Sequence, residues 1–151
     1  MRIFFLSILL LITACGYQPI FYGENKSINI GQIESNRENV IFFKIKNNLK
    51  RYQSDANSKD FINVYLDIDD KISITSKDNK GNPKTYELKV SVEIAVEKNE
   101  IIIGKKKFEE KFGYPKDNNK FNQRKYEKSL INDLTNKIIE DLNNYLFNLR
   151  A

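Results

Sequence analysis

The chain has 151 residues, a formal net charge of +5, one cysteine, and neither histidine nor tryptophan. A single cysteine excludes an intrachain disulfide, and the absence of histidine removes the side chain that most often performs acid–base catalysis near neutral pH. One domain of this length can bury a proper core without disulfides or a metal. The many Lys, Asn and Ile residues are typical of an AT-rich genome, which accounts for part of the basic balance.

The first fifteen residues have the pattern of an export signal. Arg2 precedes an apolar run, Ile3 to Ile12, of about ten residues, which is the length of a signal-peptide core and about half that of a transmembrane helix. The small residues Thr13 and Ala14 follow, and then comes the only cysteine. The segment Ile12-Thr13-Ala14-Cys15 resembles the bacterial lipobox, whose cysteine takes a diacylglyceryl group and becomes the mature N-terminus.

We therefore expect a removed signal peptide over residues 1–14, a lipidated tether over residues 15–26 and one domain over residues 27–151. A plain secretory signal, or a short apolar strand, is the alternative explanation for Cys15. Two or three acyl chains anchor a protein stably where one does so marginally, so the domain should lie at a membrane surface without crossing it. An exported protein does not normally meet nucleic acid, so lipid or an anionic glycolipid is the expected partner of a basic surface.

The first elements are a short strand and a helix. The alternation over 27–33 predicts a strand, with a bulge at Gly31. The segment Ser35-Asn36-Arg37-Glu38 matches a capping box and predicts that a helix begins there. Its apolar side would carry four residues at helical spacing: Ile41, Ile45, Leu49 and Tyr52. A polar linker follows over 53–59.

A long alternating segment comes next and predicts a strand with one buried face. Its apolar positions are Ile62, Val64, Leu66, Ile68, Ile72 and Ile74. Asp70 interrupts this set on the buried face, so we expect a bulge or bend there that lets the carboxylate reach solvent. A turn over 77–83 leads to the next strand.

Two further strands and a helix complete the chain. The third strand is predicted from the alternation of Tyr86, Leu88, Val90, Val92, Ile94 and Val96. A tight hairpin at 98–100 leads to a fourth strand whose inward residues would be Ile102, Phe108, Phe112 and Tyr114, interrupted at Gly104 and Lys106. A linker then runs to residue 122. The final helix would pack one stripe on the sheet: Tyr126, Leu130, Leu134, Ile138, Leu142, Tyr145 and Leu149.

This order predicts an α+β fold. Strands joined by short turns pair antiparallel, and two helices with one apolar stripe each can cover one face of the resulting sheet. We expect a two-layer sandwich in which a four-stranded, mainly antiparallel sheet is covered on one face by two helices, in the order β-α-β-β-β-α.

The mature N-terminus, Cys15-Gly16-Tyr17-Gln18-Pro19-Ile20, followed by this order of elements, resembles the LptE family of lipopolysaccharide-assembly lipoproteins, especially its alphaproteobacterial branch. The resemblance covers residues 15–151 and is one of pattern. It implies a lipoprotein on the periplasmic side of the outer membrane that pairs with the β-barrel LptD, sits partly in its lumen as a plug, and helps lipopolysaccharide reach the cell surface. Gly16 is compatible with outer-membrane sorting, because the inner-membrane retention signal of enteric bacteria has Asp at that position.

Two groups of lysines are candidates for contact with lipopolysaccharide phosphates. One surrounds the first hairpin: Lys77, Lys80 and Lys84. The other lies on the outward side of the fourth strand: Lys105, Lys107 and Lys111. Several ammonium groups close together are needed, because one exposed ion pair contributes little. An ordinary solvated face in a lysine-rich chain is the alternative.

We expect no enzyme, cofactor or metal site. The sequence has no glycine-rich phosphate loop and no Gly-x-Ser-x-Gly elbow, and Cys15 is not free once acylated. Asp69 and Asp70 are adjacent on a strand, so they point to opposite faces and do not converge easily. Two other roles stay open. A lipid or small-ligand carrier would have a sizeable apolar cavity, and a generic structural envelope lipoprotein would have no essential barrel partner.

Overall fold

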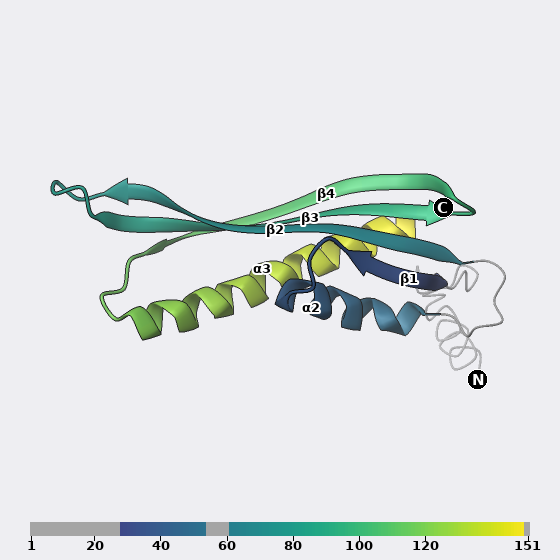
Figure 1. Cartoon of the computed structure of the whole chain (residues 1–151), viewed down its shortest axis with the longest axis horizontal. Coiled ribbons are helices and arrows are strands. Elements are labelled where there is room, and N and C mark those ends of the chain that lie inside the picture. Colours follow the sequence, from purple (N-terminus) through teal and green to yellow (C-terminus); the bar gives the residue numbers. More distant parts are fainter. Residues whose placement is uncertain (1–27, 54–60, 150–151) are drawn as a thin grey trace, which may run out of the picture.

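Three long antiparallel strands form most of the sheet: β2 (Ile62–Lys77), β3 (Pro83–Lys98) and β4 (Ile101–Pro115). The computed structural model describes residues 28–53 and 61–149 (Figure 1). The sheet order is β1-β2-β3-β4, and the short strand β1 (Ile30–Ser35) pairs parallel to β2. The predicted signal peptide, Cys15, the tether and most of the linker at 53–59 lie outside the described residues.

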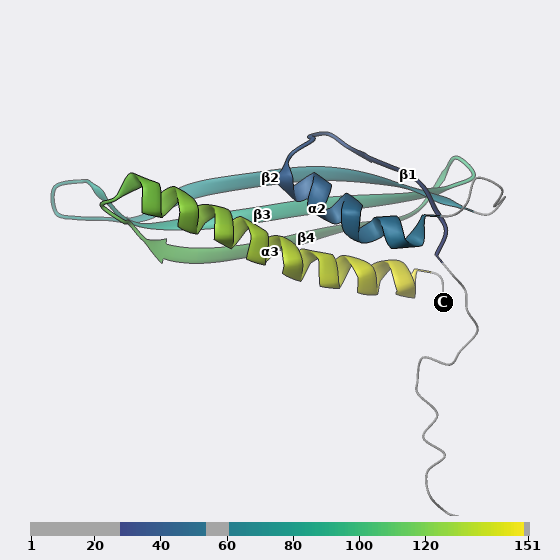
Figure 2. The ribbon, with the colours of Figure 1, turned by 90° about the horizontal axis from the view of Figure 1, so that it is seen from below.

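Two helices cover one face of this sheet, as the sequence predicts. Helix α2 (Val40–Leu49), extended by the short 3-10 turn η1 (Lys50–Tyr52), packs against β1 and β2. Helix α3 (Lys120–Asn148) lies along β3 and β4, with α2 beside its C-terminal half (Figure 2). The two-layer, mainly antiparallel α+β fold is therefore confirmed. Within the described ranges, no helix is both long and apolar enough to span a bilayer.

The core lies between the layers and is built from alternate strand positions. Every second residue of β3 from Leu88 to Val96 is fully buried, because side chains at this spacing point to the same face of the sheet. The helices contribute residues at spacings of three and four. Their fully buried members include Ile45, Leu49, Ile138 and Leu142.

The N-cap of helix α2 lies four residues after the predicted one. Ser35 is the last residue of β1, and its hydroxyl accepts a hydrogen bond from the Arg37 backbone N–H at 3.2 Å. Asn39 caps the helix instead, since its side chain accepts from the Phe42 backbone N–H at 3.0 Å. The capping box was a wrong prediction because the chain needs the residues after Ser35 to cross from the sheet layer to the helix layer.

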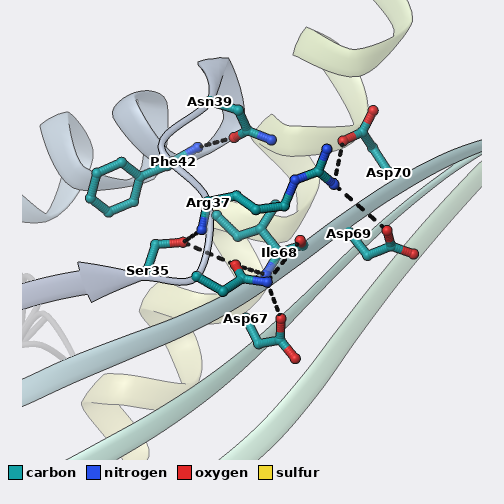
Figure 3. A network of polar contacts seen from close by, with 9 residues as sticks. Ser35, Arg37, Asn39, Phe42, Asp67, Ile68, Asp69 and Asp70 are labelled. Carbon is teal, nitrogen blue, oxygen red and sulfur yellow. Dashed lines mark hydrogen bonds and ion pairs between the residues drawn. The ribbon is translucent and has the colours of Figure 1, made fainter.

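The bulge predicted at Asp70 is absent. Pairing between β2 and β3 is regular from Asn63 to Ile74 and shifts only beyond that point. Strand β1 ends opposite Leu66, so β2 is an open edge at Asp70. The Asp70 carboxylate there lies 3.5 Å from the Arg37 guanidinium, which is also 3.7 Å from Asp69 (Figure 3). The ion pair thus replaces the bend. The irregularity expected near Gly31 is confirmed, because the pairing of β1 shifts between Ile30 and Ile33.

The covering layer is shorter than the sheet. We call the end with the β2–β3 hairpin the distal end, and the end with the β3–β4 hairpin and the start of β1 the proximal end (Figure 1). Ile72 and Ile74, predicted to be buried, are 44% and 48% exposed, because β1 and α2 do not extend along this part of β2. Three other residues predicted to face the core are also exposed: Ile102, Phe112 and Tyr126.

Candidate functional site

The N-terminal part of α3 is held on the distal end of the sheet by aromatic rings and one hydrogen bond. Tyr114 is stacked on Tyr86 at 5.7 Å between ring centroids and meets Tyr126 edge-on at 5.8 Å. The Tyr114 hydroxyl donates to Glu127 Oε1 at 2.8 Å, and Gln123 Nε2 donates to the same oxygen at 2.9 Å. Burial, and then the hydrogen bond to Glu127, raise the pKa of Tyr114 well above its usual range.

A surface pocket of about 460 Å³ lies beside this contact, between β3, the β4–α3 connection and the first turns of α3. Tyr86, Gln123 and Glu127 form part of its lining, so the residues that fix α3 also shape the pocket. Its remaining lining residues are Lys116, Asp117, Asn118, Lys120 and Arg124. A second pocket, of about 470 Å³, shares the β4–α3 connection and includes Pro115 and Tyr126.

Basic residues from the β2–β3 hairpin and from the β4–α3 connection lie together at the distal end. The Lys116 backbone N–H donates to the Lys84 carbonyl oxygen at 2.9 Å, which places the strand after the first hairpin beside the connection to α3. We define the distal basic cluster by the cations of these two regions: Lys77, Lys80, Lys84, Lys116, Lys120 and Arg124. In the part of the chain that the structure describes, no member forms an ion pair within 4.0 Å.

Nearby carboxylates are occupied by local hydrogen bonds. Asp78 accepts from the backbone N–H groups of Lys80 and Asn82, each at 2.8 Å. The Asn82 side-chain amide also donates to Asp78, at 3.1 Å. This hydrogen bond first, and then the backbone bonds and the nearby Lys116, hold the pKa of Asp78 below its usual range. Asp117 accepts from the Asn119 backbone N–H at 2.8 Å. Lys116 is attracted to Asp78 without forming an ion pair, and the other ammonium and guanidinium groups of the distal basic cluster remain available to an anion from outside the protein.

The structure separates the two predicted groups of lysines. Lys77, Lys80 and Lys84 lie at the distal end, whereas the other group lies on the face of the sheet that points away from the helices. There, Lys105 Nζ is 2.5 Å from Glu93, whose hydrogen bond raises the pKa of Lys105, and Lys107 lies 3.9 Å from Glu109. Each of these ammonium groups thus already has a carboxylate partner.

We call that sheet surface the open face, because no described element covers it. It carries rows of charged side chains across the strands. Lys111 is opposite Lys89 on β3, which is in turn opposite Lys71 on β2. Like charges in neighbouring strands repel one another, and here a bond from Lys89 to Glu109 at 3.1 Å offsets part of that repulsion. Away from the β3–β4 hairpin, the open face carries mainly polar and charged side chains.

Sequence reasoning missed Lys116, Lys120 and Arg124. These residues lie more than thirty positions from the first hairpin, and only the antiparallel pairing of β3 with β4 brings the two regions together. The available signal was their concentration directly after Pro115, at the end of the predicted fourth strand. Over residues 28–53 and 61–149, no three His, Cys, Asp or Glu side chains are grouped to hold a metal ion.

Comparison with solved structures identifies bacterial lipoproteins of the same fold. The chain is similar to rare lipoprotein B from Shewanella oneidensis, with a TM-score of 0.59 and 20% identity over 80% of this chain and 100% of that one. It is also similar to lipoprotein B from Nitrosomonas europaea, with a TM-score of 0.60 and 9% identity over 85% and 88% of the two chains. A minor lipoprotein from Acinetobacter baumannii matches with a TM-score of 0.57 and 11% identity over 82% and 95%. No protein-family profile and no curated sequence matches the chain.

Proposed function

We propose that this chain is an outer-membrane lipoprotein, acylated at Cys15, that pairs with a β-barrel of the LptD type and supports lipopolysaccharide assembly at the cell surface. The proposal depends on two observations taken together: a lipobox-like segment ends at Cys15, and the domain that follows has the fold of three bacterial lipoproteins. The LptE resemblance of the sequence supplies the outer membrane, its periplasmic side and the barrel partner. The role is one of assembly rather than catalysis.

The open face fits a barrel partner by its chemistry. The lumen of a large outer-membrane barrel is polar, and the open face presents charged side chains, several of them already in ion pairs. The free edge of β4 is lined with lysines, which oppose pairing with a strand from another chain. A surface of this kind can lie against a polar wall without a large apolar interface.

The distal basic cluster is the part of the molecule best suited to lipopolysaccharide phosphates. Its cations come from two regions and lack ion pairs among the described residues, and three of them, Lys116, Lys120 and Arg124, line the pocket of about 460 Å³. Because isolated exposed charges contribute little, the clustering is what matters. We expect the combined variant Lys84→Glu, Lys116→Glu and Arg124→Glu to reduce lipopolysaccharide binding at least tenfold.

The open face supplies a matched control for that variant. Charge reversal at Lys105, Lys107 and Lys111 changes the net charge by the same amount on another surface. It should leave binding within about twofold of the original protein, measured by retention of labelled lipopolysaccharide. Equal losses from both variants would mean that binding follows net charge rather than the distal basic cluster.

The carrier alternative requires an apolar cavity between the layers. Both pockets described above lie at the distal surface and include charged and amide side chains in their linings. The residues between the layers, among them Val92, Ile94 and Ile138, are fully excluded from solvent. These features favour an assembly role with a closed core.

The test is co-purification of the tagged full-length protein from its own envelope after crosslinking, beside a Cys15→Ala control. We expect a large outer-membrane β-barrel protein in near-equal amount with the acylated form, and a strong reduction with the control. Recovery of the acylated protein alone, or with inner-membrane or cell-wall partners, would refute the assignment. The structural-lipoprotein alternative would then take its place.

A further inference from the structure

The proximal end exposes a concentration of large apolar side chains. Ile101, Ile102 and Ile103 open strand β4 and are 67%, 63% and 44% exposed. A half-buried strand alternates apolar and polar residues, so three consecutive exposed isoleucines are unusual. Phe61, directly before β2, and Phe147, in the last turn of α3, are exposed at the same end. We call these five residues the proximal tip.

The hairpin presents the isoleucines on a rigid turn. Asn99 and Glu100 have φ values of 50° and 65°, the left-handed geometry that a tight two-residue hairpin requires at both central positions. Strand pairing resumes at once, with Ile101 opposite Lys98 and Ile102 opposite Glu97. The pairing then shifts before Gly104, so the isoleucines do not continue the inward alternation of β4. The apolar tip is thus built into the sheet.

Lysines surround the proximal tip. Lys106 follows the isoleucines, beyond Lys105, whose ammonium is paired with Glu93 on the open face. Lys50 and Arg51 lie in η1, at the same end of the helix layer. The Lys106 ammonium lies 5.1 Å from the Phe108 ring centre and 5.4 Å from that of Tyr145, so these two rings hold the charge in a fixed place by cation–π attraction. Glu100 is an acidic residue within the turn itself. An apolar point with cations behind it has the chemistry of a surface that enters the boundary between lipid headgroups and acyl chains.

The chain enters the domain at this same end. Ile30 of β1 pairs with Ile62 at the start of β2, so the polypeptide arrives from the N-terminus beside the proximal tip (Figure 1). Thirteen Cα-to-Cα steps separate Cys15 from Ile28, and even a fully extended chain spans at most about 45 Å over that many. If Cys15 is acylated, the proximal end therefore stays within about 45 Å of the membrane that holds the acyl chains, close enough to reach it.

We propose that the proximal tip is a second membrane contact, which inserts Ile101, Ile102 and Ile103 into the phospholipid surface in which the N-terminal lipid is anchored. This inference rests on the proposed acylation of Cys15. The contact involves the proximal end alone, so the remaining length of the open face stays available to the barrel partner. Since β3 has 16 residues, at about 3.3 Å each, the distal basic cluster lies roughly 50 Å from the proximal tip along the strand.

The absence of tryptophan from the sequence allows a direct test. Ile102→Trp places a single tryptophan at the proximal tip, and Ile74→Trp places one at an exposed isoleucine of the distal end. Each acylated full-length protein is reconstituted in vesicles of phosphatidylethanolamine and phosphatidylglycerol with brominated acyl chains, which quench tryptophan at close range. We expect at least twofold quenching for the Ile102→Trp protein and none for the Ile74→Trp protein.

Other outcomes would overturn the proposal. Emission of the Ile102→Trp protein that stays solvent-like and unquenched would mean that the proximal tip meets a protein partner or water, not lipid. Equal quenching of both proteins would mean that the domain lies flat on the membrane. Mass spectrometry of the N-terminal peptide from the same samples shows independently whether Cys15 is acylated. If Cys15 is unacylated, the lipoprotein assignment fails, and quenching after simple mixing with the same vesicles still decides whether the proximal tip binds lipid.

Discussion

Replacing Tyr114 by Phe should loosen the attachment of α3 to the distal end by a calculable amount. The change removes only the hydroxyl that donates to Glu127 and keeps the ring between Tyr86 and Tyr126. A hydrogen bond to a charged group contributes about 1.5–3 kcal/mol. Glu127 is half-buried and keeps its bond from Gln123, so we expect a loss of unfolding free energy at the low end of this range, about 1.5–2 kcal/mol.

Equilibrium unfolding in urea measures this loss, with Tyr126→Phe as the matched control. Tyr126 is exposed, so its variant should stay within about 0.5 kcal/mol of the original protein. The pKa of Tyr114 is raised from an ordinary value of 10.0, so its stabilising contribution is complete below pH 10 and is lost as the pH rises further. The difference between the Tyr114→Phe and original proteins should therefore be constant from pH 7 to 9 and shrink above pH 10. Equal effects of the two tyrosine variants would refute the reasoning.

Two further pairs of variants test the fold. Leu88→Ala should cost about 2–5 kcal/mol because Leu88 is fully buried, whereas Ile74→Ala on the same face should cost less than about 1 kcal/mol because Ile74 is half exposed; urea unfolding that shows equal losses would contradict the described extent of the helix layer. Asn36→Ala should cost about 1–3 kcal/mol, because its side chain accepts from the Ile68 backbone N–H at 2.9 Å. Arg37→Ala should cost under about 1 kcal/mol, because its ion pairs are largely exposed, and a thermal melt in which Arg37→Ala is the more damaging change would show that this ranking is wrong.

Much of the sheet was predictable because alternating apolar and polar residues indicate which side of a strand faces the core. This prediction is confirmed from Leu88 to Val96, where the helices cover the whole length of the segment. It failed for Ile72 and Ile74, because a periodic pattern does not say how far the covering layer extends. Helix α2 stops short of them, and the same alternation leaves them in solvent.

The starts of the two helices were predicted less accurately, because a local motif does not show which element its residues belong to. A capping box needs its serine to be free of a strand, and Ser35 is the end of β1. Helix α3 begins at Lys120, a few residues before the predicted start. The Asn119 side chain caps it, so the helix begins before the apolar stripe from which its start was predicted.

The candidate site was predicted in part. The lysines of the first hairpin were identified from sequence, but their neighbours Lys116, Lys120 and Arg124 depend on a contact between distant segments. The ion pairs that neutralise Lys105 and Lys107 depend on the register of β3 with β4. Composition shows how many charges a chain has, and only the register shows which of them have partners.

The central claim is tested most directly by measuring lipopolysaccharide on the surface of cells from which this protein has been depleted. The proposed function predicts that surface lipopolysaccharide falls as the protein is lost and returns with the original gene, but not with the Cys15→Ala form. Unchanged surface lipopolysaccharide in fully depleted cells would contradict the account.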